Sequence, residues 1–208
     1  MKVFRDGDLY RMYYRGSDVI YTKDGFSTPR PEVACYAESP DGIHWTRPDL
    51  GLFEFNGSKK NNIIWMGYGA HNFAPFLDEN PDCPADERIK ALAGSSRRGL
   101  WAFASADGKK FRKLRDKAVI DNGFFDSLNL AFWDSVSGLY REFHRDFRGK
   151  GVTSVQEHRR IFSTGPEPLS GLRGSRLWDA TRGCRADQGC RSGQANAPGA
   201  SVNSTQTR

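Results

Sequence analysis

The feature that most constrains the fold of this chain is a repeated strand–turn–strand pattern. Residues 35–45 read CYAESPDGIHW and residues 102–111 read AFASADGKKF. In both copies an apolar segment leads through Ser-x-Asp-Gly to an aromatic residue. Ser and Asp bond nearby backbone amides in tight turns, and Gly accepts the positive φ that such turns need. The pattern predicts two antiparallel hairpins, each with an aromatic second strand that packs between sheets.

A second repeat lies beside the first. Residues 9–15 (LYRMYYR) and 139–145 (LYREFHR) share Leu-Tyr-Arg, a later aromatic residue and a final Arg, and residues 88–94 (RIKALAG) take the equivalent place between them. Repeats at this spacing, with turn residues about every ten positions, are typical of consecutive four-stranded units.

Helical signals are weak throughout the chain. No stretch keeps a helical apolar spacing over three turns, and residues 84–91 read as one turn leading into a strand. Residues 51–62 and 77–84 are polar and rich in turn formers, so we expect them to be long loops. The sequence therefore predicts an all-β fold.

The composition changes near residue 157. All ten lysines precede residue 151, the last tyrosine is Tyr140, and residues 171–208 are mostly Gly, Ser, Arg, Ala, Thr and Gln. Such a segment cannot bury enough apolar surface to offset its ordering entropy. We therefore divide the chain into a β-rich part, residues 1–156, and a tail, residues 157–208, that we expect to be disordered or out of frame.

A shifted reading frame would explain the tail. When the codons for residues 158–166 are started on their third base, the degenerate code allows Ser-x-Asp-Phe-Leu-His-Trp-Thr. This would be a third copy of the hairpin, placed after the strand that contains Tyr140. Sequencing the gene across codons 150–170 tests the frameshift hypothesis.

Charge and cysteine usage narrow the possible partners. The net charge of +6 and the pI of about 9.2 resemble those of nucleic-acid-binding proteins. However, the tail from residue 158 holds eight arginines and three acids, so the rest of the chain is close to neutral. We predict no nucleic-acid partner and, since no apolar run could span a bilayer, no membrane partner. Localisation and oligomeric state stay open.

The cysteines and histidines suggest no metal centre. Neither group shows the spacing of metal ligands, and a disulfide framework is rare in a chain of this length. We therefore expect no metal and no cofactor. Two cysteines are expected in a strand and a loop and two in the tail: Cys35, Cys83, Cys184 and Cys190.

Together these segments resemble the five-bladed β-propeller glycoside hydrolases, the group around families 32 and 43, and most closely a bacterial branch of it. The resemblance covers residues 1 to about 156 and is carried by LYRMYYR (9–15), CYAESPDGIHWTRP (35–48), NNIIW (61–65), HNFAPFLD (71–78) and FDSLNLAFWD (125–134). The Arg-Asp-Pro and Glu-Cys-Pro signatures of the invertase-like members do not occur.

The resemblance implies part of a propeller. About 160 residues would form two and a half to three blades, and a propeller needs about four or more blades to close its ring. We therefore expect a fragment truncated at both ends, whose parent protein hydrolyses or binds a glycan and which is itself inactive. The alternative is a non-catalytic propeller that binds carbohydrate or protein. A sialidase-like enzyme would need an arginine cluster, for which only Arg15 and Arg145 are candidates.

The resemblance also implies carboxylates that converge from different blades, one as general acid and one as base or nucleophile. The catalytic candidates are Asp126 ahead of an apolar strand, Asp78 after the 71–77 segment, and Glu32 at a strand start as a general acid. Each has a structural alternative: a turn cap for Asp126, a solvated or capping residue for Asp78, and a solvated strand end for Glu32.

The candidate substrate-binding residues are polar side chains in the same segments: His71, Asn72, Asn129 and Arg145. Loop packing is the alternative for His71 and Asn72. Arg15, at the same place in its repeat as Arg145, favours a structural role for both arginines. Asp41 and Asp107 are assigned to their turns, and most tryptophans to packing between sheets.

Overall fold

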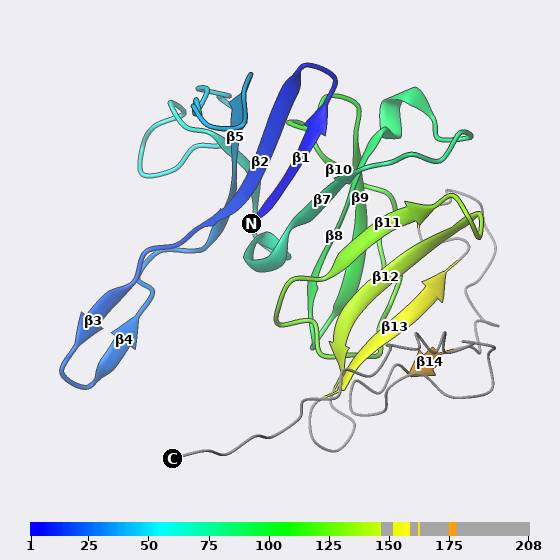
Figure 1. Cartoon of the computed structure of the whole chain (residues 1–208). Helices are drawn as coiled ribbons and strands as arrows, with labels where there is room; N and C mark the ends of the chain where they lie inside the picture. The colour runs from blue at the N-terminus through cyan, green and yellow to red at the C-terminus, as the bar shows by residue number, and fades with distance from the viewer. Residues whose placement is uncertain (147–151, 159–161, 163–174, 178–208) are drawn as a thin grey trace, which may run out of the picture.

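The structure, a computed structural model, describes residues 1–146, 152–158, 162 and 175–177. This part of the chain is built almost entirely of antiparallel strands (Figure 1), which confirms the predicted all-β class. Its only helical elements are two short 3-10 turns, η1 (Ala70–Asn72) and η2 (Ala85–Glu87).

Twelve strands form three four-stranded sheets in which spatial order follows chain order. The first sheet contains β1 (Lys2–Asp6), β2 (Leu9–Gly16), β5 (Val33–Ser39) and β6 (Ile63–Met66). The second contains β7 (Ala74–Leu77), β8 (Ile89–Ser95), β9 (Gly99–Ser105) and β10 (Arg112–Lys113). The third contains β11 (Leu130–Asp134), β12 (Leu139–Asp146), β13 (Val152–His158) and β14 (Ser175–Leu177).

The remaining two strands, β3 (Ile20–Thr22) and β4 (Gly25–Ser27), form a separate ribbon between β2 and β5. In Figure 1 this ribbon projects away from the three sheets. The β3–β4 ribbon, taken here with its connecting residues as residues 17–31, is called the arm below.

The repeated segments occupy equivalent places in the three sheets. Residues 9–15, 88–94 and 139–145 lie in β2, β8 and β12, the second strand of each sheet apart from Arg88, which precedes β8. The expected loop at 51–62 is also found, and the loop expected at 77–84 begins after Leu77, the last residue of β7. The repeat thus correctly indicated three equivalent strands.

The two Ser-x-Asp-Gly turns have the predicted geometry. Gly42 and Gly108 have φ values of 78° and 72°, in the region that only glycine enters without strain. The amide of Gly42 donates to Ser39 Oγ at 2.9 Å, and the amide of Gly108 donates to Ser105 Oγ at 2.9 Å. The assignment of Asp41 and Asp107 to these turns is confirmed, since each carboxylate accepts hydrogen bonds from backbone amides of its own turn.

The prediction of an aromatic strand directly after each turn is wrong. Asp41 Oδ1 accepts the amides of residues 43 and 44, and Asp107 Oδ1 accepts those of residues 109 and 110. Because these amides are bound to the carboxylates, they cannot continue the ladder with the preceding strand. Only a Glu38–Thr46 bridge follows the first turn, and the two-residue β10 starts after Phe111 in the second.

The sheets meet through their first strands. β1 lies against β7, and β7 lies against β11. One apolar cluster fills the space between the first and second sheets, and another lies between the second and third. Their largest buried members are Tyr13, Tyr36, Phe73 and Phe103 in the former and Phe76, Phe125, Tyr140 and Phe162 in the latter.

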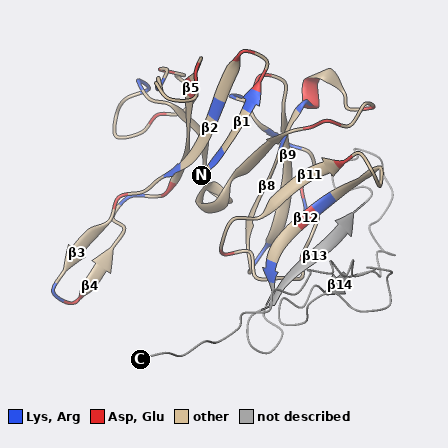
Figure 2. Ribbon diagram, in the orientation of Figure 1, with Lys and Arg blue, Asp and Glu red and all other residues tan. Residues whose placement is uncertain are grey.

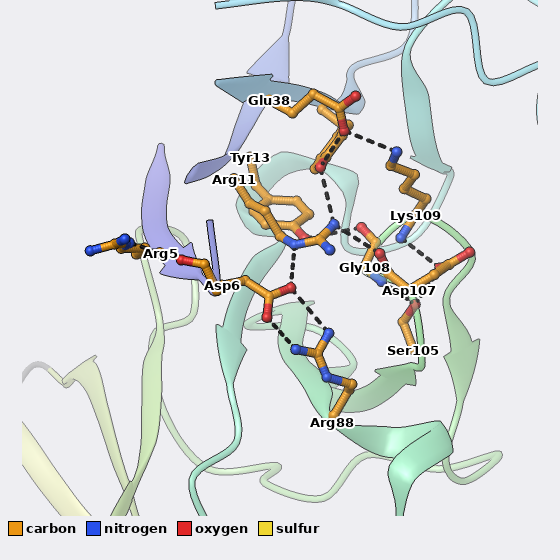
Figure 3. Close-up of polar contacts among 12 residues, drawn as sticks. Arg5, Asp6, Arg11, Tyr13, Glu38, Arg88, Ser105, Asp107, Gly108 and Lys109 are labelled. Atoms are coloured by element: carbon orange, nitrogen blue, oxygen red, sulfur yellow. Dashed lines mark hydrogen bonds and ion pairs between the residues drawn. The ribbon is translucent and has the colours of Figure 1, made fainter. Parts of the chain in front are cut away.

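A polar network crosses the boundary between the first two sheets (Figure 3). Asp6 of β1 accepts a hydrogen bond from Arg11 Nε at 2.7 Å and also binds Arg88 of the second sheet. The bonds from Arg88 are the main reason that the pKa of Asp6 is lowered; those from Arg11 add to the effect, and burial opposes it. Arg11 and Tyr13 extend the network to the second turn by donating to the carbonyls of Asp107 and Gly108.

Few residues of the predicted tail are described. Phe162 is buried against Phe76 and Tyr140, with ring centroids 5.3 Å and 5.0 Å away, and Ser175–Leu177 pairs with β13. The expectation of disorder or a changed frame otherwise falls on residues outside the described part, as do Cys184 and Cys190. Cys35 in β5 and Cys83 in the 78–84 loop are both free thiols, at the predicted places.

Candidate functional site

A pocket of about 400 Å³ opens where chain segments of all three sheets meet. Two of the segments that line it directly precede β7 and β11, and the others come from the start of β1, the end of β2, and β5. A volume of this size lies within the range of about 300–1,000 Å³ that is common for small-molecule sites. The lining residues are Met1, Tyr13, Tyr14, Arg15, Ala34, Ala70, His71, Asn72, Phe73, Asp126, Ser127 and Leu128.

One side of the pocket carries a Glu32–His71–Arg15 cluster. His71 Nδ1 lies 2.6 Å from Glu32 Oε2, and Arg15 Nη1 lies 3.0 Å and 3.1 Å from the two ring nitrogens. Because a carboxylate only accepts, the proton on Nδ1 points to Glu32, which leaves Nε2 to accept from Arg15. Arg15 Nε is also 3.6 Å from Glu32 Oε1.

The third sheet contributes an acid–arginine pair on another side of the pocket. Asp126 Oδ2 accepts a hydrogen bond from Arg145 Nη2, and about half of the Asp126 side chain is exposed. The backbone explains why the two residues meet. Phe124 forms an isolated antiparallel bridge with Arg145, and its amide donates to the Arg145 carbonyl at 2.9 Å.

Asn72 lines the pocket, but its amide group bonds to backbone groups of the protein. Its side chain is buried, and Nδ2 donates to the carbonyl of Phe125 at 2.6 Å. Its Oδ1 accepts the amide of Gly94 at 2.9 Å. Asn72 therefore joins the second sheet to the residue that precedes Asp126, and both ends of its amide group are already used.

Phe125, the residue before Asp126, is positioned by a backbone hydrogen bond and by the packing of its buried ring. Its amide donates to Ser96 Oγ at 3.1 Å, and its ring is fully buried with its centroid 4.9 Å from that of His144. His144 is in turn bound to the buried Glu142 at 2.7 Å. A Cβ on Gly123 would lie 2.5 Å from His144 Nε2, so only glycine fits there.

The η1 turn links the two sides of the pocket. His71 contacts Glu32 and Arg15 of the first sheet, whereas the next residue, Asn72, binds the second and third sheets. The turn begins after Gly69, which has φ 86° and would bring a Cβ to 2.7 Å from the Cβ of Ala93. The η1 turn therefore contacts Glu32 on one side of the pocket and the residue before Asp126 on the other.

Asp78, the second catalytic candidate, lies outside this group. Its side chain is fully buried, binds Lys90 Nζ at 2.5 Å and accepts from Tyr140 Oη at 2.7 Å. Burial by itself lowers the pKa of Lys90, but the bonds to Asp78 and Cys83 outweigh it and raise that pKa. Asp78 thus forms a buried ion pair within the second sheet, and its hydrogen bond from Tyr140 links that sheet to the third.

Asn129, predicted to bind substrate, is also fully buried and does not line the pocket. Its Nδ2 donates to the carbonyl of Ser127 at 3.0 Å. Of the predicted site residues, His71, Asn72 and Asp126 line the pocket, and Glu32 and Arg145 bind His71 and Asp126. Asp78 and Asn129 lie apart from this group. The repeat favoured a structural role for Arg15, but Arg15 lines the pocket. Its alignment with the site candidate Arg145 was the sequence signal that could have identified Arg15 as a pocket residue.

Tyr13 and Tyr14 were not identified from the sequence as pocket residues. The hydroxyl of Tyr14 accepts from Asn62 Nδ2 at 2.7 Å, and that of Tyr13 donates to Gly108 O at 3.0 Å. Burial is the main cause of the raised pKa of Tyr13. Aromatic residues are frequent in a sequence of this kind, so nothing in the local pattern distinguishes these two from others.

The described residues contain no cluster of three or more His, Cys, Asp or Glu side chains that could hold a metal ion. None of the helices in the described part is long and apolar enough to cross a membrane. Basic and acidic residues are interspersed along the described strands and turns (Figure 2). Comparison with family models, with curated proteins and with solved structures finds no match for this chain.

Proposed function

We propose that the three sheets are consecutive blades of a five-bladed β-propeller of the glycoside hydrolase type. The strand order supports this, because each blade of a propeller is a four-stranded antiparallel sheet. The contacts of β1 with β7 and of β7 with β11 add support, since the first strands of successive blades adjoin around the central axis. The three sheets would represent part of such a ring.

The pocket is proposed to bind a glycan. The observation that carries this proposal is that His71, Arg15 and Asp126 line one pocket. Behind them, Glu32 binds His71 and lies near Arg15, and Arg145 binds Asp126. Sugars present many hydroxyl groups, which bond well to carboxylates, guanidinium groups and imidazoles. Tyr14 and Phe73 add aromatic surface beside these polar groups.

Hydrolysis of a glycosidic bond would use the two carboxylates. One must protonate the leaving oxygen, and the other must act as nucleophile or activate a water. We assign Asp126 as the base or nucleophile because it lines the pocket and is half exposed. Glu32 would be the acid, with His71 Nδ1 fixing the orientation of its carboxyl group.

The alternative is a glycan-binding propeller without catalysis. Each carboxylate here accepts hydrogen bonds from a guanidinium or an imidazole, and a general acid must instead carry and release its own proton. This observation favours binding over hydrolysis.

The experiment is an assay of the chain on a panel of 4-nitrophenyl glycosides, with binding of oligosaccharides measured by calorimetry. Turnover that falls at least about 100-fold in Asp126→Asn supports the hydrolase, because removal of a catalytic carboxylate has effects of about that size or more. Saturable binding without turnover, weakened by the same substitution, supports the binding module.

Asp49→Asn is the matched control. Asp49 is exposed and does not line the pocket, so the same chemical change there is expected to leave turnover and binding unchanged. Absence of both turnover and binding in a chain whose near-UV circular dichroism shows a folded protein would contradict the proposed function.

A further inference from the structure

The arm is the part of the described chain with the most exposed apolar surface. Tyr21 is 82% exposed, Phe26 70% and Ile20 49%. The two aromatic rings lie next to each other across the ribbon, with centroids 6.4 Å apart. Clustered apolar residues of this kind mark interaction surfaces, whereas single ones are common on any protein.

The backbone of the arm is also left incomplete. β3 and β4 pair with each other through three residues each, and no other described strand joins their sheet. A two-stranded ribbon is marginally stable in water and gains stability from further strands. The outer edges of β3 and β4 offer unpaired N–H and C=O groups to such strands.

The base of the arm, in contrast, is well fixed. Arg30 Nε donates to Asp18 Oδ2 at 2.8 Å and closes the ribbon where it leaves the first sheet. The flanking residues, Arg15 and Glu32, belong to the Glu32–His71–Arg15 cluster. The arm is therefore held at its base, and its apolar surface is presented at a distance from the sheets (Figure 1).

We propose that the arm is a self-association surface that pairs with the arm of a second copy of this chain. Two ribbons that pack face to face about a two-fold axis would cover the aromatic rings of both copies. The arm holds two acids and two bases, Asp18, Asp24, Lys23 and Arg30, so two copies would not repel each other.

The area involved sets the expected strength of the dimer. An aromatic side chain buries about 150–250 Å², so the four rings of two arms would bury about 600–1,000 Å². Specific stable interfaces bury about 1,200–2,000 Å², and smaller ones are weak or transient. The dimer should therefore be weak and dissociate on dilution.

The test is sedimentation velocity of the chain from about 1 to 200 μM, a range that brackets micromolar dissociation constants. The expected result is a shift from monomer to dimer over this range, and loss of the dimer in the double variant Tyr21→Ser/Phe26→Ser. Tyr21→Lys should also abolish it, because the two added positive charges would lie in the contact between the two aromatic faces. Near-UV circular dichroism of each variant checks that the sheets remain folded.

Val136→Ser is the matched control, since Val136 is an apolar residue that is 96% exposed in the β11–β12 turn. It should leave the dimer intact. A wild-type chain that stays monomeric at every concentration overturns the proposal, as does a dimer that survives in the double variant or is equally lost in Val136→Ser. No glycan takes part in these measurements, so their outcome does not depend on the function proposed for the pocket.

Discussion

The turns at residues 39–42 and 105–108 are built by the same bonds, but only the second lies inside a boundary between sheets. In both, a serine hydroxyl accepts the glycine amide, and an aspartate accepts the next two amides. A Cβ on Gly42 would have ordinary contacts of 3.5 Å with the Tyr10 ring. A Cβ on Gly108 would come within 2.5 Å of Tyr13 Oη and 2.8 Å of Ile89 Cδ1.

The same local sequence thus has two roles. The first turn closes a hairpin at the surface, where His44 bonds to Asp41 at 2.7 Å and helps to lower the pKa of that carboxyl. The second turn receives Arg11 and Tyr13 of the first sheet on its carbonyl groups (Figure 3). The comparison teaches that a turn motif specifies a chain reversal, while its tertiary surroundings decide how much stability depends on it.

The largest effect is expected from alanine at the two glycines. Both positions have positive φ, which costs a residue with a Cβ about 1–2 kcal/mol. Gly108→Ala also creates steric overlap with Tyr13 and Ile89, so we expect a total loss of about 3 kcal/mol against about 1 kcal/mol for Gly42→Ala. Urea unfolding measures the loss of unfolding free energy in each variant. Equal losses would show that the tertiary surroundings of Gly108 add nothing to the cost of the substitution.

The next largest effect is expected from Asp6→Asn, which weakens the network that holds the second turn. Loss of charge-assisted hydrogen bonds to Arg88 and Arg11 should lower the free energy of unfolding by about 2 kcal/mol at pH 7. The pKa of Asp6 is lowered in the folded state from its ordinary 3.8. Its contribution is therefore complete above that pH and is lost as pH falls through the folded-state pKa.

The difference between wild type and Asp6→Asn should accordingly shrink when urea unfolding is repeated below pH 3.8. Asp8→Asn is the control, since Asp8 is two residues away and fully exposed. It should have little effect at any pH. A wild-type-to-Asp6→Asn difference that stays constant down to pH 2 would mean that the Asp6 charge does not stabilise this boundary.

A smaller effect is expected from Tyr13→Phe. It removes the donor to the buried carbonyl of Gly108 and should cost about 1–1.5 kcal/mol. Tyr10→Phe makes the same change beside the first turn, where the tyrosine ring packs on Gly42, and should alter stability by less than about 0.5 kcal/mol. Thermal and urea unfolding of the two variants measure the two losses. Equal losses would mean that the Tyr13 hydrogen bond to Gly108 does not stabilise the boundary.

The smallest effect is expected from the ion pair that joins the two hairpins. Lys109 Nζ lies 2.9 Å from Glu38 Oε2, with about a quarter to a third of each side chain exposed. Partly exposed pairs contribute about 0–1 kcal/mol, so Lys109→Met should cost less than about 1 kcal/mol. The loss should decrease further in 1 M salt, where charges are screened. A loss above 2 kcal/mol would show that this contact governs the pairing of the sheets.

Much of the fold could be predicted from periodic features of the sequence. The repeats at 9–15, 88–94 and 139–145 predicted three equivalent strands, and the turn motif predicted two tight chain reversals. Strand boundaries after the turns were mispredicted, because the amides of residues 43, 44, 109 and 110 bind aspartate side chains instead of a neighbouring strand. An aspartate side chain and a neighbouring strand compete for the same backbone amides. This competition is local, but residue type alone does not determine which acceptor binds the amide.

The candidate site was predicted less completely. Asp126, Glu32 and His71 were selected because the family resemblance implies converging carboxylates and sugar-binding polar groups. Asp126, His71 and Arg15 line one pocket, and Glu32 is bound to His71. Asn72 and Asp78 are equally polar. Asn72 nevertheless bonds to the backbone of Gly94 and of Phe125, and Asp78 forms a buried ion pair. Nothing in their sequence neighbours distinguishes a side chain that faces a pocket from one that crosses a boundary.

The sequence by itself determined the all-β class, the three equivalent second strands and the geometry of both Ser-x-Asp-Gly turns. These features depend on interactions between residues close in the chain, and such interactions are encoded by residue type and spacing. Only the tertiary structure decided that η1 would join the two sides of the pocket and that Gly108 would lie against Tyr13. Those contacts join residues far apart in the chain, and they exist only once the sheets have packed against each other.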